Sequence, residues 1–354
     1  MIPNELHITI KKALEQNREL KELYENDETV KKLLEIAMAL EGMPRQASTH
    51  ACGIVITKEP VVTYVPLYMR DNTISTQYIM TTLEELGLLK MDFLGLRTLT
   101  VIQDTIDLVK ANKGVQVEFD NDMNDPKVYK LWQDGNSVGI FQFESQGMTN
   151  FMKELKPDCL EDIIAGVSLY RPGPMDQIPR YIANKKDPEH AVYTHPALKP
   201  ILKVTYGCMV YQEQVMQIVR DLAGYSLGRA DLVRRAMGKK KLDVMARERE
   251  IFINGQLDED GNIVVPGCVR NGIDAESANR IFDEMAEFAK YAFNKSHAAA
   301  YAVVSYRTAY LKAYYPAEFM AATLNSFLGN LDKIPDYIEE CRRLNISILK
   351  PDIN

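Results

Sequence analysis

Apolar residues at three- to four-residue spacing dominate this sequence, and that spacing places them on one face of a helix. Residues 5–41 show it among Lys and Glu, and Gly42 and Pro44 end the pattern. Beyond Gly95 the same spacing predicts further helices at 98–110, 126–132, 160–169, 213–222, 229–237, 275–288, 298–313 and 317–327. We therefore expect a fold that is mostly helical.

The interval between these helical parts has a different texture. Residues 53–57 and 61–65 are short and rich in β-branched side chains, and Lys-Glu-Pro separates them, which predicts two strands. A further strand is predicted at 88–93. With these strands the fold class becomes α+β.

Alternation along the strand at 88–93 places Lys90 and Asp92 on the same face. A Lys and an Asp on an otherwise apolar strand need partners, because burying either charge alone is costly. Two interpretations are open: an ion pair at a strand edge, or a metal-binding carboxylate with a cation beside it.

A local basic window stands out in a chain whose net charge is −7. Residues 228–250 hold eight Lys or Arg against four Asp or Glu. Arg234 and Arg235 are about 100° apart on a helix, so we expect them to diverge and to hold a polyphosphate from two sides. The alternative is ordinary helix-end chemistry, with Asp231 pairing with Arg235 at i,i+4.

A polar cluster at 293–301 precedes another predicted helix. Ser296 is expected to cap this helix, which puts His297 in its first turn, where a neutral imidazole is favoured. Lone histidines are also common as structural residues, so this alternative stays open.

Several function classes are excluded. The sequence has no Gly-rich phosphate loop and no Ser-His-Asp elbow motif. The five cysteines stand singly, which fits neither a zinc motif nor a disulfide scaffold, so we expect reduced thiols in a cytoplasmic protein. No apolar stretch is long enough to span a membrane.

Six motifs together resemble the alpha subunit family of bacterial DNA polymerase III, in the order expected for that family. They are Lys90-Met-Asp92-Phe-Leu-Gly-Leu-Arg-Thr-Leu-Thr100, Phe141-Gln-Phe-Glu-Ser145, Tyr170-Arg-Pro-Gly-Pro174, Tyr211-Gln-Glu-Gln-Val-Met216, Arg234-Arg-Ala-Met-Gly-Lys-Lys-Lys241 and Phe293-Asn-Lys-Ser-His297.

The resemblance implies a template-directed DNA polymerase that uses Mg²⁺, primer–template DNA and deoxynucleoside triphosphates. It implies the end of the thumb at 1–46, part of a polymerase-beta-like palm at 47–96 and the fingers at 97–354. The sliding clamp and other replicase subunits would bind through regions that this chain lacks.

The resemblance also implies roles for individual residues. Asp92 matches the third catalytic aspartate, a metal ligand, and Lys90 is the catalytic lysine beside it. The residues expected at the incoming nucleotide are Arg234, Arg235, His297, Asn294 and Lys295. Those expected at DNA are Lys239, Lys240, Lys241, Arg171 and His50.

The sequence departs from the family pattern in two respects. The family usually has His-Ala-Gly-Gly where this chain has His50-Ala51-Cys52-Gly53. Its Asp-x-Asp pair is also missing, since the matches at 120–122 and 258–260 lie in polar, turn-like stretches. We therefore expect a fragment that is inactive alone. The alternatives are a non-catalytic nucleic-acid-binding module and an unrelated ATPase that uses the two arginines.

Overall fold

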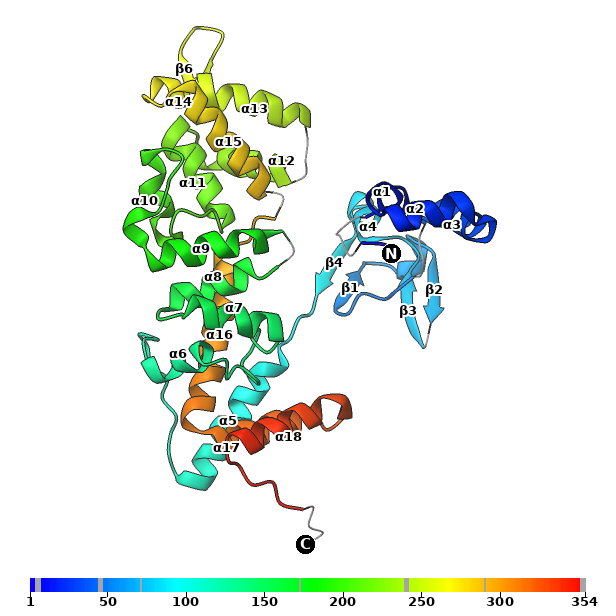
Figure 1. Cartoon of the computed structure of the whole chain (residues 1–354), viewed down its shortest axis with the longest axis vertical. Helices are drawn as coiled ribbons and strands as arrows, with labels where there is room; N and C mark the ends of the chain where they lie inside the picture. The colour runs from blue at the N-terminus through cyan, green and yellow to red at the C-terminus, as the bar shows by residue number, and fades with distance from the viewer. Residues whose placement is uncertain are drawn as a thin grey trace. The chain divides into compact units, whose positions relative to one another are not determined.

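The computed structural model describes residues 1–3, 8–43, 47–70, 72–171, 173–238, 242–289 and 291–350. These residues form two compact units, 1–95 and 96–354, which are described separately below. Helices predominate and the sheets are small and antiparallel, so the predicted α+β class is confirmed (Figure 1). The division of the first unit at residue 46 stays a prediction. Every helix of the described ranges is too short or too polar to cross a membrane.

The first unit begins with three short helices that pack around Ala13, Leu20 and Leu34. They are α1 (Ile10–Gln16), α2 (Arg18–Asn26) and α3 (Glu28–Leu40). The side chain of Asn17 accepts a hydrogen bond from the N–H of Leu20 at the start of α2. The side chain of Asp27 accepts hydrogen bonds from the N–H groups of Thr29 and Val30 at the start of α3. These caps explain why a single periodic stretch folds as separate helices.

The strands of the first unit form two antiparallel pairs. The elements are β1 (Gly53–Ile56), β2 (Leu67–Arg70), β3 (Thr73–Thr76) and β4 (Leu89–Asp92), with η1 (Val61–Thr63) before β2 and α4 (Met80–Glu85) before β4. β1 pairs with β4, and β2 with β3. The strands predicted at 53–57 and 88–93 are confirmed.

The strand predicted at 61–65 is wrong, because residues 61–63 form a 3₁₀ helix. The N–H groups of Thr63 and Tyr64 donate to Pro60 and Val61 rather than to a neighbouring strand. β-branched residues favour a strand only where a partner strand can pair with them. The elements β2, β3 and α4 of this unit were not predicted.

The second unit is almost entirely helical. Its helices are α5 (Arg97–Lys113), α6 (Pro126–Gln133), α7 (Gln146–Leu155), α8 (Leu160–Leu169), α9 (Ile178–Lys186), α10 (Lys199–Leu202), α11 (Gln212–Ala223), α12 (Leu227–Gly238), α13 (Leu242–Asn254), α14 (Gly267–Arg270), α15 (Ala275–Ala289), α16 (Lys295–Tyr314), α17 (Pro316–Ser326) and α18 (Ile334–Arg343). A short hairpin joins β5 (Gln256–Leu257) and β6 (Ile263–Val265). Each helix predicted beyond Gly95 is present, and the prediction missed α7, α9, α10, α13, α14 and α18.

Helix α16 connects two of the hydrophobic clusters of this unit. Ala298, Ala302, Tyr306 and Ala309 belong to the cluster formed with α6, α7 and α8, and Leu311 belongs to the one formed with α5, α17 and α18. Helix α16 contacts α8, α6, α5 and α17. Its alanines bring neighbouring backbones close, so the helix is buried along much of its length.

Lys312 ties the far end of α16 to its surroundings. Its fully buried Nζ donates to the carbonyl oxygens of Asn136 (2.8 Å) and Val138 (2.7 Å) and to Oε1 of Glu340 (2.7 Å). Burial lowers the pKa of Lys312, and the Glu340 carboxylate opposes that shift. One buried cation therefore links α16, the loop after α6 and α18.

We predict that Lys312→Met lowers the free energy of unfolding by about 3–5 kcal/mol, because Glu340 and two carbonyls lose their buried partner. Urea denaturation followed by circular dichroism measures this loss. The matched control is Lys130→Met on α6, whose pair with Asp134 is largely exposed and whose loss costs less than about 1 kcal/mol. Equal, small losses for both variants would show that the buried pair does not hold α18.

Candidate functional site

Lys90 and Asp92 lie on one face of β4, as the alternation predicts, and their side chains form an ion pair. The hydrogen bond from Lys90 lowers the pKa of the Asp92 carboxyl, and the nearby His50 adds to this effect. Gly53, opposite Asp92 on β1, leaves room for both basic side chains. A Cβ at that position would lie 2.5 Å from Cε of Lys90 and 2.9 Å from Nδ1 of His50.

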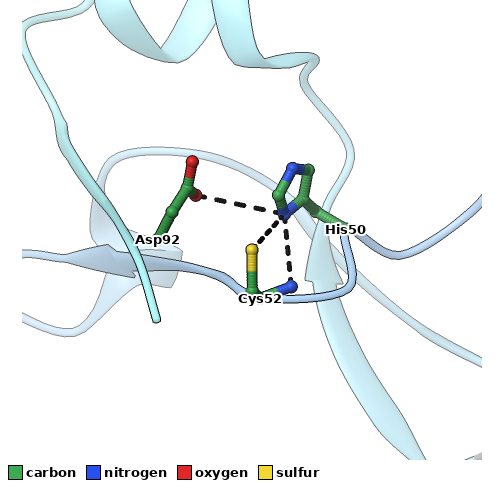
Figure 2. A group of neighbouring side chains, drawn as sticks. All are labelled: His50, Cys52 and Asp92. Carbon is green, nitrogen blue, oxygen red and sulfur yellow. Dashed lines mark hydrogen bonds and ion pairs between the residues drawn. The ribbon is translucent and has the colours of Figure 1, made fainter. Parts of the chain in front are cut away.

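His50 precedes β1 and lies against the same carboxylate, as Figure 2 shows. Its Nδ1 accepts the N–H of Gly53 (2.8 Å) and the N–H of Cys52 (3.3 Å). The same Nδ1 is 3.6 Å from Sγ of Cys52 and 4.0 Å from Oδ1 of Asp92. The predicted contact of His50 with DNA stays a prediction.

These residues do not assemble a magnesium site by themselves. Magnesium prefers oxygen ligands in octahedral geometry, and two-metal phosphoryl transfer needs carboxylates that clamp both ions. Asp92 supplies one carboxylate, and the atoms grouped with it in the described residues are an imidazole nitrogen and a thiol sulfur.

The two Asp-x-Asp matches lie in turns, as predicted, and the oxygens of Asp120 and Asp258 accept neighbouring backbone N–H groups. Asp120 accepts the N–H groups of Asp122 and Asn124. Asp258 accepts those of Asp260 and Asn262 in the β5–β6 hairpin. Their oxygens stabilise local turns.

The arginine pair on α12 differs from its prediction. Arg234 donates to Oδ1 of Asp231 (2.7 and 3.0 Å), and Nε of Arg235 lies 2.7 Å from Oδ2 of the same residue. The expected divergence is therefore wrong, because one carboxylate with two oxygens draws both guanidinium groups together. The alternative pairing of Asp231 with Arg235 at i,i+4 is confirmed. The pair also lowers the pKa of Asp231, Arg234 most strongly.

Helices α11 and α16 begin side by side. The N–H of Gln212 donates to the carbonyl of Phe293 (2.9 Å), and the carboxylate of Glu213 accepts the N–H of Lys295 (3.1 and 3.2 Å). The cap of α16 is the Asn294 side chain, which accepts the N–H of His297 (3.0 Å). The expected Ser296 cap is wrong, because Ser296 already lies within the first turn.

Aromatic contacts fix the side chains near this junction. The His297 ring is 4.1 Å from the ring of Tyr301 and 5.3 Å from that of Phe293, centre to centre. The guanidinium of Arg171 lies over Phe293 at 3.9 Å and donates to two backbone carbonyls. These contacts give Arg171 a structural role, and its predicted DNA contact stays a prediction.

Gln212 joins the arginine pair to this junction, because its side-chain oxygen Oε1 accepts a hydrogen bond from Nη1 of Arg234 (2.9 Å). Arg234 is thus linked through Gln212 to the start of α16, which carries Asn294, Lys295 and His297, and Arg235 is linked to Arg234 through Asp231. Sequence reasoning assigned no role to Gln212 or Glu213, although both stand in the Tyr211-Gln-Glu-Gln motif. Lys239, Lys240 and Lys241 lie outside the described residues.

The electrostatic balance of the junction is close to neutral. Arg234 and Arg235 pair with Asp231, and Nζ of Lys295 lies 3.1 Å from Glu161. The side chain of Arg234 is 23% exposed and that of Arg235 is 64% exposed. A polyanion would bind by replacing the acidic partners in the ion pairs with these cations. Of the two arginines, Arg235 is the more accessible to such a ligand.

A cavity of about 320 Å³ is also part of the second unit, lined in part by Pro174, Arg180, Phe288 and Tyr291. Its charged lining residues are one arginine and three acids, namely Asp176, Arg180, Glu284 and Glu287. This negative balance disfavours a polyphosphate, so the cavity is a poorer anion site than the helix junction.

Comparisons with known proteins agree with the motifs. Residues 98–260 match the family model described as the bacterial DNA polymerase III alpha subunit finger domain, and residues 1–95 match the bacterial DNA polymerase III alpha NTPase domain. Together these two matches cover most of the chain.

Curated relatives named DNA polymerase III subunit alpha match from end to end of this chain. The protein from Borreliella burgdorferi is 47% identical over 356 residues, which cover 100% of this chain and 30% of that protein. The one from Thermus aquaticus is 49% identical over 353 residues, 98% of this chain and 28% of that protein. The one from Escherichia coli K12 is 43% identical over 368 residues, 100% of this chain and 31% of that protein.

The chain thus spans about 30% of the length of the curated relatives that it matches. Two domain models of one family match it in sequence, and the relatives carry a single name at high identity. The chain belongs to the alpha subunit family of bacterial DNA polymerase III.

Proposed function

We propose that this chain supplies the incoming-nucleotide site and one catalytic carboxylate to a DNA-directed DNA polymerase. In the whole protein, a primer 3′-hydroxyl would attack the alpha-phosphate of a deoxynucleoside triphosphate, and pyrophosphate would leave. Family membership supports the reaction class. The observation that carries the assignment of the nucleotide site is the bonded connection from Arg234 through Gln212 and Glu213 to the start of α16.

The arginine pair would bind the triphosphate. A guanidinium can make two parallel hydrogen bonds to phosphate oxygens, and neighbouring guanidinium groups on one side of α12 would neutralise charge that develops on the leaving group. Gln212 orients Arg234 from the start of α11, so that a phosphate only has to replace Asp231. Lys295 and His297 would approach the same nucleotide from the first turn of α16.

Asp92 and Lys90 would act at the reacting end of the nucleotide. The carboxylate keeps its charge because Lys90 bonds to it. Magnesium chemistry there would need further carboxylates from the rest of the whole protein. Primer–template DNA, the sliding clamp and other replicase subunits are proposed partners of that whole protein.

We predict that the purified 354-residue chain does not extend a primer, because Asp92 alone cannot clamp two metal ions. Gel-based primer extension over a range of chain concentrations is the measurement. Extension proportional to chain concentration, and abolished by Asp92→Asn, would contradict this prediction, whereas extension that survives Asp92→Asn would come from a contaminant.

In the whole polymerase, Arg234→Ala and Arg235→Ala should each lower kcat/KM for the nucleotide by roughly 10- to 100-fold. Charge-assisted hydrogen bonds to phosphate are worth roughly 1.5–3 kcal/mol, and about 1.4 kcal/mol corresponds to a factor of ten. Steady-state nucleotide titrations on a fixed primer–template measure the effect. Arg220→Ala on α11 is the matched control, since Arg220 is half-exposed, pairs with a neighbouring aspartate and has no proposed role.

The second candidate is a nucleic-acid-binding module without catalysis, which the excess of Lys and Arg at 228–250 favours. The same variants distinguish it. If they left nucleotide kcat/KM unchanged and made the salt dependence of DNA binding shallower, the arginines would contact the DNA backbone.

A further inference from the structure

We propose that His50, Cys52 and Asp92 bind one borderline-soft divalent cation of the zinc class. The three residues offer one nitrogen, one sulfur and one oxygen ligand, and these atoms lie within 4.8 Å of one another. Figure 2 shows the three side chains converging from the loop before β1 and from β4. Because all three belong to the first unit, the proposed site is complete within that unit.

The distances are close to those of a tetrahedral zinc site. Zinc bonds of about 2.3 Å to sulfur and about 2.0 Å to nitrogen, at a tetrahedral angle, separate the two ligand atoms by about 3.5 Å. The observed separation of Sγ of Cys52 and Nδ1 of His50 is 3.6 Å. Oδ1 of Asp92 is 4.0 Å from the same nitrogen, where the tetrahedral value is about 3.3 Å, so a small side-chain rotation completes the set.

The hydrogen bonding of His50 and the exposure of these groups also suit a cation. Backbone N–H groups donate to Nδ1 of His50, so this nitrogen carries the lone pair that a metal needs. A bound ion would take over that lone pair. His50 and Asp92 are 52% and 42% exposed, so an ion can enter and keep a water molecule as its fourth ligand.

Lys90 competes with a metal ion for Asp92, because its ammonium group already forms an ion pair with the Asp92 carboxylate. Zinc binding would therefore displace Lys90 from Asp92 and occupy the one carboxylate on β4. The ligand types distinguish this site from a magnesium site. Zinc binds thiolate and imidazole ligands, whereas magnesium prefers oxygen ligands.

A second cluster, Asp158, Cys159 and Asp162, serves as an internal comparison. It has no imidazole, and Lys185 bonds to both of its carboxylates, at 2.7 Å to Asp162 and 3.3 Å to Asp158. Burial raises the pKa of the Cys159 thiol to about 11, which disfavours the thiolate that a metal requires. We therefore expect no cation there.

The test is a titration of the purified chain with Co²⁺, a coloured probe for zinc sites, in the presence of a reductant that does not bind metals. We expect one Co²⁺ per chain, with a thiolate-to-cobalt charge-transfer band that disappears when Zn²⁺ is added. Cys52→Ser should abolish the band and weaken binding by at least about 100-fold, since loss of a direct ligand costs more than loss of its supporting partners. Cys159→Ser is the matched control and should change neither.

His50→Asn tests the imidazole without losing the turn, because the asparagine oxygen can still accept the N–H of Gly53. We expect it to weaken Co²⁺ binding about 100-fold, as should Asp92→Asn. Circular dichroism checks that each variant is folded. If Cys52→Ser does not fold, Cys52→Gly, which restores the residue usual in the family, replaces it.

Several results would overturn the proposal: no charge-transfer band in the unchanged chain, a band that survives Cys52→Ser, or a band lost in Cys159→Ser. One Co²⁺ per two chains would also overturn it, because the thiol would then bridge two copies. The outcome is independent of the proposed polymerase function, since it measures metal binding alone.

Discussion

The start of helix α16 is the constraint on which the second unit depends. The Asn294 side chain and the Glu213 carboxylate satisfy N–H groups that a helix start leaves without partners, and they do so from two different elements. At the far end, Lys312 is buried among two carbonyls and Glu340. With both ends held and much of its surface buried, α16 fixes how α5, α6, α8 and α17 pack on it.

The proposed nucleotide site inherits its geometry from that helix start. Its cations are held by acidic partners in the free chain, so the site is preorganised and nearly neutral rather than strongly positive. Preorganised charges need little rearrangement when a substrate arrives, and an exchange of Asp231 for phosphate keeps each guanidinium hydrogen-bonded. The Lys90–Asp92 pair in the first unit has the same character, because the lysine keeps the carboxylate ionised.

Much of this fold follows from local sequence patterns, and the errors have several causes. Apolar spacing predicts most of the long helices, including α6 and α17, which begin with a proline that is tolerated at the first helical position, but it missed α7, α9, α13 and α18. The strand expected at 61–65 failed for lack of a partner. Arg234 and Arg235 converge because each binds a different carboxylate oxygen of Asp231. Cys52 lies near Asp92 because β1 pairs with β4. No spacing rule contains that information.

The most direct test of the central claim is an amide NMR titration of the chain with the magnesium complex of dATP, with assigned resonances. Binding at the helix junction predicts shifts that saturate at Gln212, Lys295 and His297 and at the Nε–H of Arg234, and none around Arg180 in the acidic cavity. Shifts confined to that cavity, or no shifts at the start of α16 at any nucleotide concentration, would contradict the assignment of the triphosphate to the junction of α11, α12 and α16.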